Sequence, residues 1–173
     1  VEDAAVIVAA ISMKGVQEIA DRLKSISIPS DTILVSATKG LAPTTCQTPS
    51  QIWAAAFPHN PIAVLSGPNL SQEIGQGLPA ATVVACEDAI AATTVQHLLA
   101  SDNFRIYTNT DRLGTELGGT LKNVVAIAVG VCDGLNLGQN ARAALITRAL
   151  PEMIRVGTLM GGKVETFYGL SGL

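Results

Sequence analysis

The sequence predicts an α/β fold in which a largely parallel sheet is followed by helices only. Short apolar runs alternate with segments of helical periodicity up to residue 109, as in parallel strands joined by crossover helices. Beyond Asp111, helical periodicity and glycine-rich breaks continue without a further predicted strand. This change predicts a domain boundary near residue 110, with residues 1–110 in one domain and residues 111–173 in an all-α region.

Five short apolar runs are predicted to form the strands. Continuous apolar runs of about four to eight residues are typical of parallel strands covered on both faces. In chain order they are residues 6–11, 32–36, 61–65, 81–86 and 104–108.

The segments between these runs are predicted to be helices and turns. Val16, Ile19, Ala20 and Leu23 recur at helical spacing, which predicts a helix over residues 12–25. The other helices are predicted at residues 50–57, around Gln72 and Glu73, and at residues 87–100.

Residues 116–130, Glu-Leu-Gly-Gly-Thr-Leu-Lys-Asn-Val-Val-Ala-Ile-Ala-Val-Gly, are the first candidate for chemistry. The Gly118-Gly119 pair is predicted to break the chain, which places Lys122 and Asn123 in the first turn of a buried helix. A cation there faces the positive end of the macrodipole, at a cost of about 0.3–1 kcal/mol. Desolvation beside an apolar helix would also lower the pKa of Lys122. Local rules tend to be broken where function demands it. The alternative is a lysine that snorkels at a helix start.

Two loops follow predicted strands and could bind a ligand, because ligands in open parallel sheets bind outside the carboxyl ends of the strands. The loop at 37–40 contains Lys39, a charge, and Gly40, which permits close approach. The loop at 66–69 contains Gly67-Pro68 close to a helix start, where anions are favoured. Either loop alone could be an ordinary turn. Lys39 and Lys122 together favour a site for a phosphate or carbonyl ligand.

Composition excludes several classes of protein. Apolar residues make up 48% of the 173 residues and charged residues 14%, which excludes disorder. A net charge of −3, no basic cluster and only 3% aromatic residues argue against nucleic acid as a partner. Apolar runs stop short of the roughly 18 residues of a membrane span, so no membrane span is predicted.

Low charge favours self-association of the protein into a homo-oligomer. The start Val1-Glu2-Asp3 is not that of a signal peptide, and we expect the chain to begin inside a larger protein.

The cysteines and histidines are isolated from one another. Cys46, Cys86 and Cys132 show no metal-ligand spacing and are predicted to be small buried hydrophobes in a reducing cytoplasm. Neither a metal nor a disulfide is expected. His59 and His97 are predicted at the surface, which argues against nucleophilic catalysis with a histidine base.

Six short motifs occur in order along the chain. They are residues 36–41 (Ser-Ala-Thr-Lys-Gly-Leu), 65–68 (Leu-Ser-Gly-Pro), 116–124, 133–134 (Asp-Gly), 140–148 (Asn-Ala-Arg-Ala-Ala-Leu-Ile-Thr-Arg) and 169–173 (Gly-Leu-Ser-Gly-Leu). Together they closely resemble bacterial-type NAD(P)-dependent glycerol-3-phosphate dehydrogenase, from about residue 30 to the end.

The resemblance implies a fold and a reaction. The family has an N-terminal Rossmann domain and a helical substrate domain, with the active site between them; here the first strands of the Rossmann sheet are missing. The family reduces dihydroxyacetone phosphate to sn-glycerol 3-phosphate with NADH or NADPH, at the entry to glycerophospholipid synthesis in the cytoplasm.

The resemblance also implies roles for individual residues. Lys122 would be the catalytic acid/base and would bind substrate. The other implied contacts are Lys39 to substrate and cofactor, Gly67, Asn69 and Asn123 to substrate, and Ser71 to cofactor. Asn69 and Ser71 depart from the family, which usually has Ser or Thr and then Ala there. A lysine of lowered pKa suits proton donation near neutral pH, and its charge stabilises a developing oxyanion.

Two larger departures affect the expected activity. The glycine-rich turn GxGxxG after the first strand of the family is absent, and with it the pyrophosphate cradle. The chain also stops before a Gly-Asp and an Arg-Asn of the family. We therefore expect this central fragment to have little or no activity, although its parent would be an enzyme. The sequence does not decide between NAD and NADP as the cofactor. The alternatives are a related two-domain hydroxyacid dehydrogenase and a non-catalytic remnant that serves as an assembly module.

Overall fold

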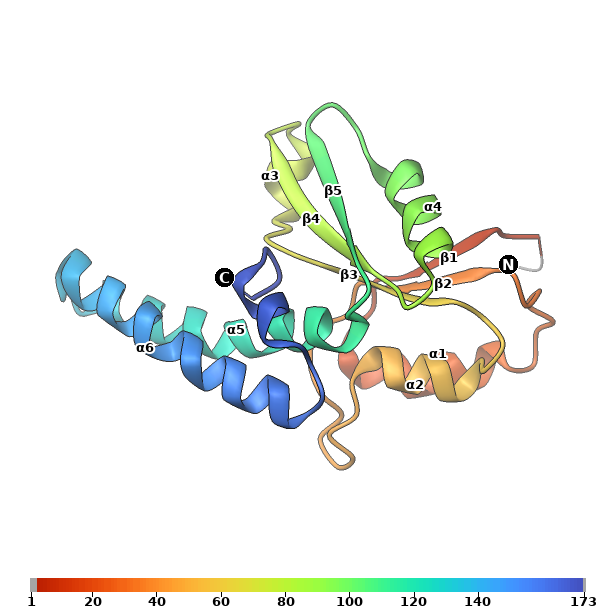
Figure 1. Ribbon diagram of the computed structural model, residues 1–173, viewed down its shortest axis with the longest axis horizontal. Helices are drawn as coiled ribbons and strands as arrows, with labels where there is room; N and C mark the ends of the chain where they lie inside the picture. The colour runs from red at the N-terminus through yellow and green to blue at the C-terminus, as the bar shows by residue number, and fades with distance from the viewer. Residues whose placement is uncertain (1–2, 173) are drawn as a thin grey trace.

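The structure is a computed structural model that describes residues 3–172 (Figure 1). Five strands form one sheet in the order β1-β2-β3-β4-β5. Their bounds are β1 Val6–Ala9, β2 Ile33–Ser36, β3 Ile62–Ser66, β4 Ala80–Ala85 and β5 Phe104–Asn109. All neighbouring pairs are parallel except β3 with β4, which is antiparallel. The predicted largely parallel sheet is confirmed. The connection before β4 contains only the five-residue helix α3 (Ser71–Gly75), and the chain returns antiparallel.

Helices cover both faces of this sheet, as the apolar runs predicted. Helices α1 (Met13–Leu23) and α2 (Pro49–Ala56) lie on one face, and α4 (Ala89–Leu99) lies on the other (Figure 1). Side chains alternate between the faces of a strand. Leu34 therefore packs with α1 and α2, while its neighbours Ile33 and Val35 pack with α4.

Strand β1 differs from the prediction. It ends at Ala9 instead of residue 11, and its side chains are partly exposed rather than covered on both faces. Val8, for example, is 46% exposed. The reason is its position: β1 is an edge strand, paired only with β2 among the described strands.

The predicted helix start after Gly118-Gly119 was wrong. Helix α5 (Arg112–Gly134) runs through both glycines without interruption. Asp111 caps the start of this helix, and its side chain accepts a hydrogen bond from the Gly114 N–H at 2.9 Å. Lys122 is therefore in mid-helix, and the macrodipole cost of a first-turn cation does not apply. Local composition misled the prediction, because glycine in a helix interior costs only about 1 kcal/mol.

The two glycines serve close packing instead. A Cβ atom on Gly118 would lie 3.1 Å from the carbonyl oxygen of Ser171, and one on Gly119 would overlap the Ser66 hydroxyl. Gly118 thus admits the loop at the end of the chain, and Gly119 admits the end of β3. These contacts attach α5 to the sheet.

Helix α6 (Gly138–Leu159) and the 3₁₀ helix η1 (Val164–Tyr168) complete the chain. Figure 1 shows α5 and α6 side by side, projecting away from the sheet. The described part of the chain has no strand after Asn109, as predicted. The division into two domains near residue 110 remains a prediction.

Helix α5 is long and apolar enough, by length and composition alone, to cross a membrane. Its residues from Gly114 to Gly119 are buried inside the protein, but only 22% of its apolar 18-residue stretch is buried. The predicted absence of a membrane span rested on uninterrupted apolar runs and remains a prediction.

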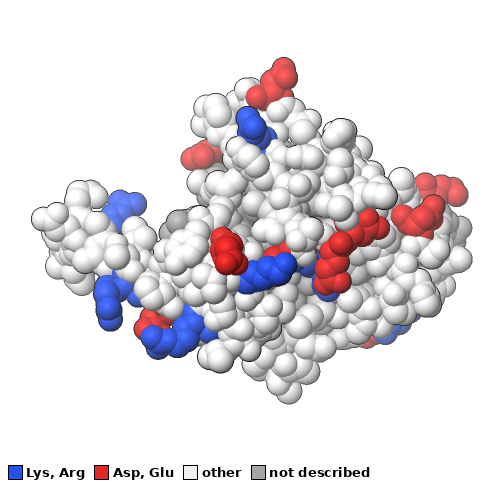
Figure 2. Space-filling view, viewed as in Figure 1, with Lys and Arg blue, Asp and Glu red and all other residues white. Residues whose placement is uncertain are grey.

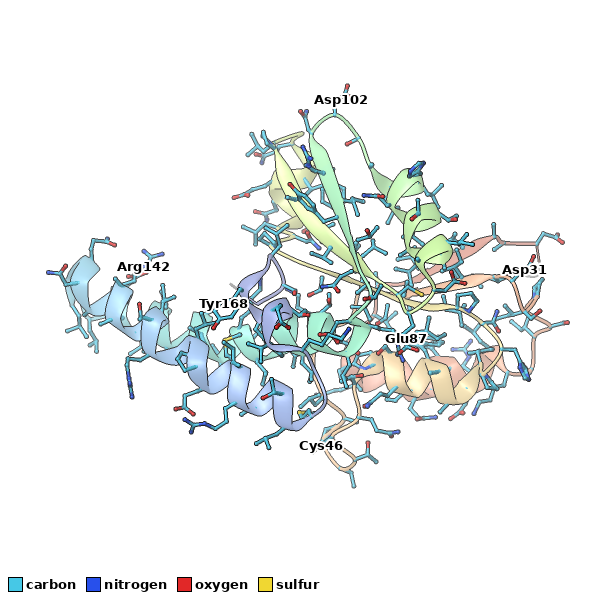
Figure 3. All side chains as sticks on the ribbon, viewed as in Figure 1. Asp31, Cys46, Glu87, Asp102, Arg142 and Tyr168 are labelled. Atoms are coloured by element: carbon cyan, nitrogen blue, oxygen red, sulfur yellow. The ribbon has the colours of Figure 1, made fainter. Side chains whose placement is uncertain are left out.

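The cysteines are only partly as predicted. Cys86 and Cys132 are buried, but Cys46 is exposed. Figure 3 shows Cys46 at the outer end of the loop between β2 and α2. Its φ of 55° is the left-handed conformation of a tight turn, which holds the residue away from the core. His59 and His97 are exposed, as predicted. In Figure 2 the Lys and Arg side chains are scattered among wide uncharged areas.

Candidate functional site

Lys122 lies where α5, the end of β3 and the C-terminal loop meet. Its Nζ donates a hydrogen bond of 3.2 Å to the carbonyl oxygen of Leu170. Burial lowers the pKa of Lys122 below the ordinary lysine value, and the positive charge of Lys39 lowers it further. The direction agrees with the sequence prediction. The desolvation comes from mid-helix burial, however, and not from a helix start.

Lys39 is the second cation of this site. It is exposed on the loop after β2, and its Cε lies 3.8 Å from the position that a Cβ on Gly119 would occupy. Gly40 follows with a φ of 125°, a conformation that L side chains rarely adopt. The backbone N–H of Gly40 donates to Thr120 Oγ1 at 3.0 Å. Lys39 and Gly40, both from the loop at 37–40, therefore lie against the helix that carries Lys122.

The loop after β3 is organised by Thr82 on β4. A Cβ on Gly67 would lie 2.8 Å from Thr82 Oγ1, so only glycine fits there. Asn69 Nδ2 donates to the same hydroxyl at 3.0 Å. Asn69 Oδ1 and Ser66 Oγ are buried and have no hydrogen-bond partner within residues 3–172. Ser36 Oγ, at the end of the neighbouring strand β2, is also buried without a hydrogen-bond partner in the described residues.

Asn123 and Ser71 are placed less tightly. Both are exposed, Asn123 next to Lys122 on α5 and Ser71 at the start of α3. Asn123 and Lys122 line one end of a pocket of about 270 Å³ between α5 and α6, whose other walls are apolar and include Ile146, Leu150 and Met153. In residues 3–172 no hydrogen bond joins Asn69, Ser71 or Asn123 to either lysine. The structure thus brings together Lys39 and Lys122, but it leaves these three roles as predictions.

Two buried carboxylates, one before α5 and one within it, were missed at the sequence level. Asp111 accepts hydrogen bonds from Gly114 N–H, from Lys163 N–H at 2.8 Å and from Thr166 Oγ1 at 2.6 Å. It joins the start of α5 to η1. The available signal was its place before the helical region, which is that of an N-cap.

The second carboxylate, Glu116, lies within α5. It is only 2% exposed and accepts hydrogen bonds from the Ser50 N–H at 2.9 Å and from Ser50 Oγ at 2.5 Å. Burial raises its pKa, an effect that the hydrogen bonds from Ser50 and Thr48 oppose. The sequence did contain a signal for Glu116, because it is a lone carboxylate in a stretch of apolar residues and glycine.

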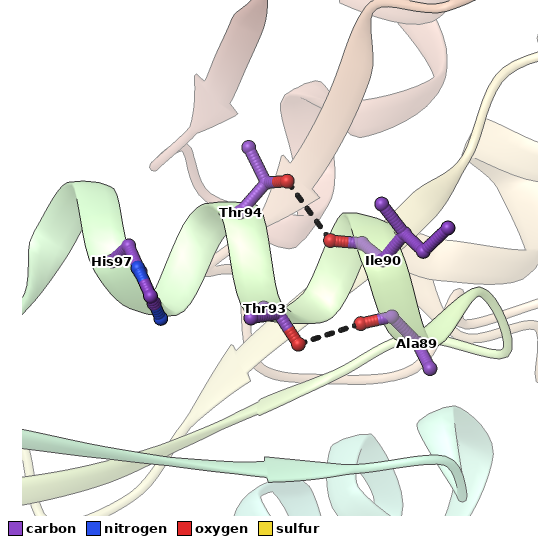
Figure 4. A pocket seen from close by; sticks show the side chains of 5 residues that line it. All are labelled: Ala89, Ile90, Thr93, Thr94 and His97. Carbon is purple, nitrogen blue, oxygen red and sulfur yellow. Dashed lines mark hydrogen bonds between the residues drawn. The ribbon is translucent and has the colours of Figure 1, made fainter.

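A hollow on the outside of α4 offers no comparable chemistry (Figure 4). It measures about 560 Å³ and is lined by Ala89, Ile90, Thr93, Thr94 and His97. The threonine hydroxyls donate to the Ala89 and Ile90 carbonyl oxygens of the same helix, at 2.8 and 2.9 Å. They already have partners, so we place the site at Lys122.

The chemistry available at Lys122 is proton transfer beside an anion. A half-buried amine of lowered pKa gives up a proton more readily than an ordinary lysine does. Lys39 supplies a second positive charge, which suits an anionic substrate. Within residues 3–172, no group of three or more His, Cys, Asp or Glu residues is placed to hold a metal ion.

Comparisons with known sequences point to one family. The model described as "NAD-dependent glycerol-3-phosphate dehydrogenase N-terminus" matches residues 1–92, and the corresponding C-terminus model matches residues 111–173. The chain is 69% identical to the glycerol-3-phosphate dehydrogenase (NAD(P)+) of Acaryochloris marina, over 98% of this chain and 55% of that protein. It is 65% identical to the Synechocystis protein of the same name, over 100% of this chain and 55% of that protein.

Solved structures agree with these matches. The glycerol-3-phosphate dehydrogenase of Coxiella burnetii is 40% identical with a TM-score of 0.87, over 96% of this chain and 50% of that one. The Dunaliella salina structure is 25% identical with a TM-score of 0.91, over 100% of this chain and 30% of that one. The chain thus spans about half the length of the curated relatives it matches. Its sheet and helices have the Rossmann-like arrangement of these dehydrogenases, and the chain belongs to the NAD-dependent glycerol-3-phosphate dehydrogenase family.

Proposed function

We propose that the protein containing this chain reduces dihydroxyacetone phosphate to sn-glycerol 3-phosphate with NADH or NADPH. The observation that carries the proposal is Lys122, a half-buried amine of lowered pKa with a second cation beside it. The names of the relatives support the reaction class.

In this proposal Lys122 is the proton donor. Its ammonium group donates a proton to the substrate carbonyl oxygen as negative charge develops there, which also stabilises the oxyanion. The Leu170 carbonyl accepts one Nζ–H, which orients the amine and leaves its other protons for the substrate. Lys39 attracts the anionic phosphate ester. Gly67, Asn69 and Asn123 are proposed to contact substrate.

NAD(P)H, when bound, supplies the hydride for the carbonyl carbon. Lys39 and Ser71, which are both exposed, are proposed to contact this cofactor. A pyrophosphate cradle needs a glycine-rich turn between a strand and a helix. Residues 75–80 have the letters GxGxxA, but they follow α3 and lead into β4, the reverse order. We propose that other parts of the full-length protein hold the pyrophosphate, and that this chain alone has little or no activity.

The cellular setting follows from the reaction. We propose a cytoplasmic enzyme that supplies sn-glycerol 3-phosphate for glycerophospholipid synthesis and acts as a homo-oligomer. Residues 1–110 are proposed to belong to its dinucleotide-binding domain and residues 111–173 to its substrate domain.

The test is Lys122→Met in the full-length protein, with Lys14→Met as a control at an exposed lysine of α1. Lys122→Met should lower kcat for dihydroxyacetone phosphate by at least about 100-fold, the usual contribution of a positioned proton donor. The control should keep wild-type turnover. Near-wild-type turnover by Lys122→Met, or a preference of the wild type for a 3-hydroxy acid, would refute the proposal.

A further inference from the structure

Helix α5 is attached at two points to the segment that follows Lys39. The first is the 3.0 Å hydrogen bond from the Gly40 N–H to Thr120 Oγ1, which joins residues 80 positions apart. Gly40 comes directly after Lys39, and Thr120 comes two residues before Lys122. One hydrogen bond therefore connects the backbone of one lysine to the helix that carries the other.

The second attachment is one helical turn earlier on α5. Glu116 binds Ser50, the second residue of α2, through both its N–H and its hydroxyl. Residues four apart lie on the same face of a helix, so Glu116 and Thr120 meet this segment from one side. A carboxylate is also favoured at a helix N-terminus. The segment from Gly40 to Ser50 is thus held against α5 at both ends.

Between these attachments the loop has little support. Residues 43–46 are exposed, and Cys46 has a positive φ. The backbone bonds of its turn join Ala42 with Gln47 and with Cys46, inside the loop itself. The backbone of Lys39 is therefore held on one side by Thr38, whose Oγ1 donates to the Ile11 carbonyl oxygen at 2.9 Å, and on the other side by the attachment at Gly40.

We infer that Thr120 is a positioning residue, whose hydroxyl holds Gly40, and through it Lys39, at a fixed place beside Lys122. This inference rests on the proposed roles of the two lysines and names a residue that fixes their geometry. Without the hydroxyl, Gly40 loses its partner, and the exposed Lys39 side chain moves away from the site.

The charges around Lys122 make the position of Lys39 measurable. Lys39 is the charged group that lowers the pKa of Lys122. Among the described residues, the C-terminal loop contributes the neutral carbonyl of Leu170, and α6 contributes apolar side chains such as Ile146 and Met153. Moving Lys39 away should therefore raise the pKa of Lys122 and weaken binding of an anionic substrate.

The experiment compares three variants of the full-length protein. Thr120→Val removes the hydroxyl and keeps the β-branched shape, and Thr120→Ser keeps the hydroxyl. Thr115→Val is the matched control, because Thr115 is fully buried on the same helix but its Oγ1 has no hydrogen-bond partner within residues 3–172. For Thr120→Val we expect KM for dihydroxyacetone phosphate to rise about three- to tenfold, the effect of one hydrogen bond. We expect Thr120→Ser and Thr115→Val to stay near the wild type.

A second readout does not depend on turnover. The pH midpoint for acetylation of Lys122, followed by mass spectrometry, should move toward the ordinary lysine value in Thr120→Val and stay in place in Thr115→Val. If Thr120→Val matches Thr115→Val in both KM and midpoint, the inference is wrong. If instead the wild type fails to reduce dihydroxyacetone phosphate, the proposed function is wrong, and the acetylation midpoint still decides whether Thr120 positions Lys39.

Discussion

Lys122 Nζ and the carbonyl oxygen of Leu170 form a hydrogen bond of 3.2 Å across 48 residues of chain. The bond forms because Gly118, one turn before Lys122, has no side chain and lets the loop at 171–172 approach α5. Within residues 3–172, the hydrogen bond of this amine goes to a neutral acceptor and not to a carboxylate, which would raise the pKa. This arrangement explains how a lysine in mid-helix can be held in place while its pKa stays lowered.

The pH profile of reduction should depend on the charge of Lys39. As the proposed proton donor, Lys122 must be protonated, so kcat/KM of the full-length protein should fall as the pH rises through the lowered pKa of Lys122. Lys39→Met removes the repulsion and should move this fall to higher pH, while Lys14→Met leaves it in place. Measuring kcat/KM against pH in all three proteins checks this. If kcat/KM falls at the same pH in Lys39→Met as in the wild type, Lys39 does not lower the pKa of Lys122.

The buried carboxylate Glu116 should make folding stability depend on pH. Its pKa in the folded protein is raised above the ordinary value of about 4.5, so the folded state binds the proton more tightly than the unfolded chain does. The free energy of unfolding should therefore decrease as the pH rises from about 4.5 through the folded-state pKa. Glu116→Gln should lack this decrease, because the amide does not ionise.

Urea denaturation of the wild type and Glu116→Gln at several pH values measures that effect. The control is Glu165→Gln, at an exposed carboxylate of η1, which should track the wild type throughout. A constant difference in stability between Glu116→Gln and the wild type from acid to neutral pH would contradict the prediction.

Two glycines in the last helices should respond to alanine in opposite ways. A Cβ on Gly157 would overlap the ring of Phe167, which is fully buried, and Gly130 has open space. Gly157→Ala should therefore destabilise the protein by about 1–3 kcal/mol, as overpacking does. Gly130→Ala should stabilise it by up to about 1 kcal/mol through helix propensity. Thermal denaturation of both variants measures these changes in stability. If Gly157→Ala is more stable than the wild type, the ring of Phe167 can move aside for the added methyl group.

The three thiols should differ in reactivity. Cys46 is exposed, Cys86 and Cys132 are buried, and burial also raises the pKa of the Cys86 thiol. Because the thiolate is the reactive form, an aromatic disulfide reagent should modify Cys46 quickly and the other two only after unfolding. Cys46→Ser should abolish the fast phase. Persistence of that phase in Cys46→Ser would place a second thiol at the surface.

The local pattern of the sequence was enough to predict the order of strands and helices. Strand β2 was predicted because a strand buried on both faces has a continuous apolar run. Helix α1 was predicted because a helix buried on one face has apolar residues at helical spacing. Both patterns can be read from a short stretch of sequence. Lys39 and Lys122 were likewise selected from their own neighbourhoods. These are features that a window of a few residues contains.

The meaning of Gly118-Gly119 was decided only by the tertiary structure. By itself the pair resembles a chain break, but the end of β3 and the C-terminal loop pack against both glycines and keep them in a helix. The same holds for Glu116 and Thr120, whose partners Ser50 and Gly40 are 66 and 80 residues away. Such contacts depend on how distant segments close-pack. The sequence alone therefore selected the candidate lysine, and packing across the fold determined its burial, its acceptor and its neighbouring charge.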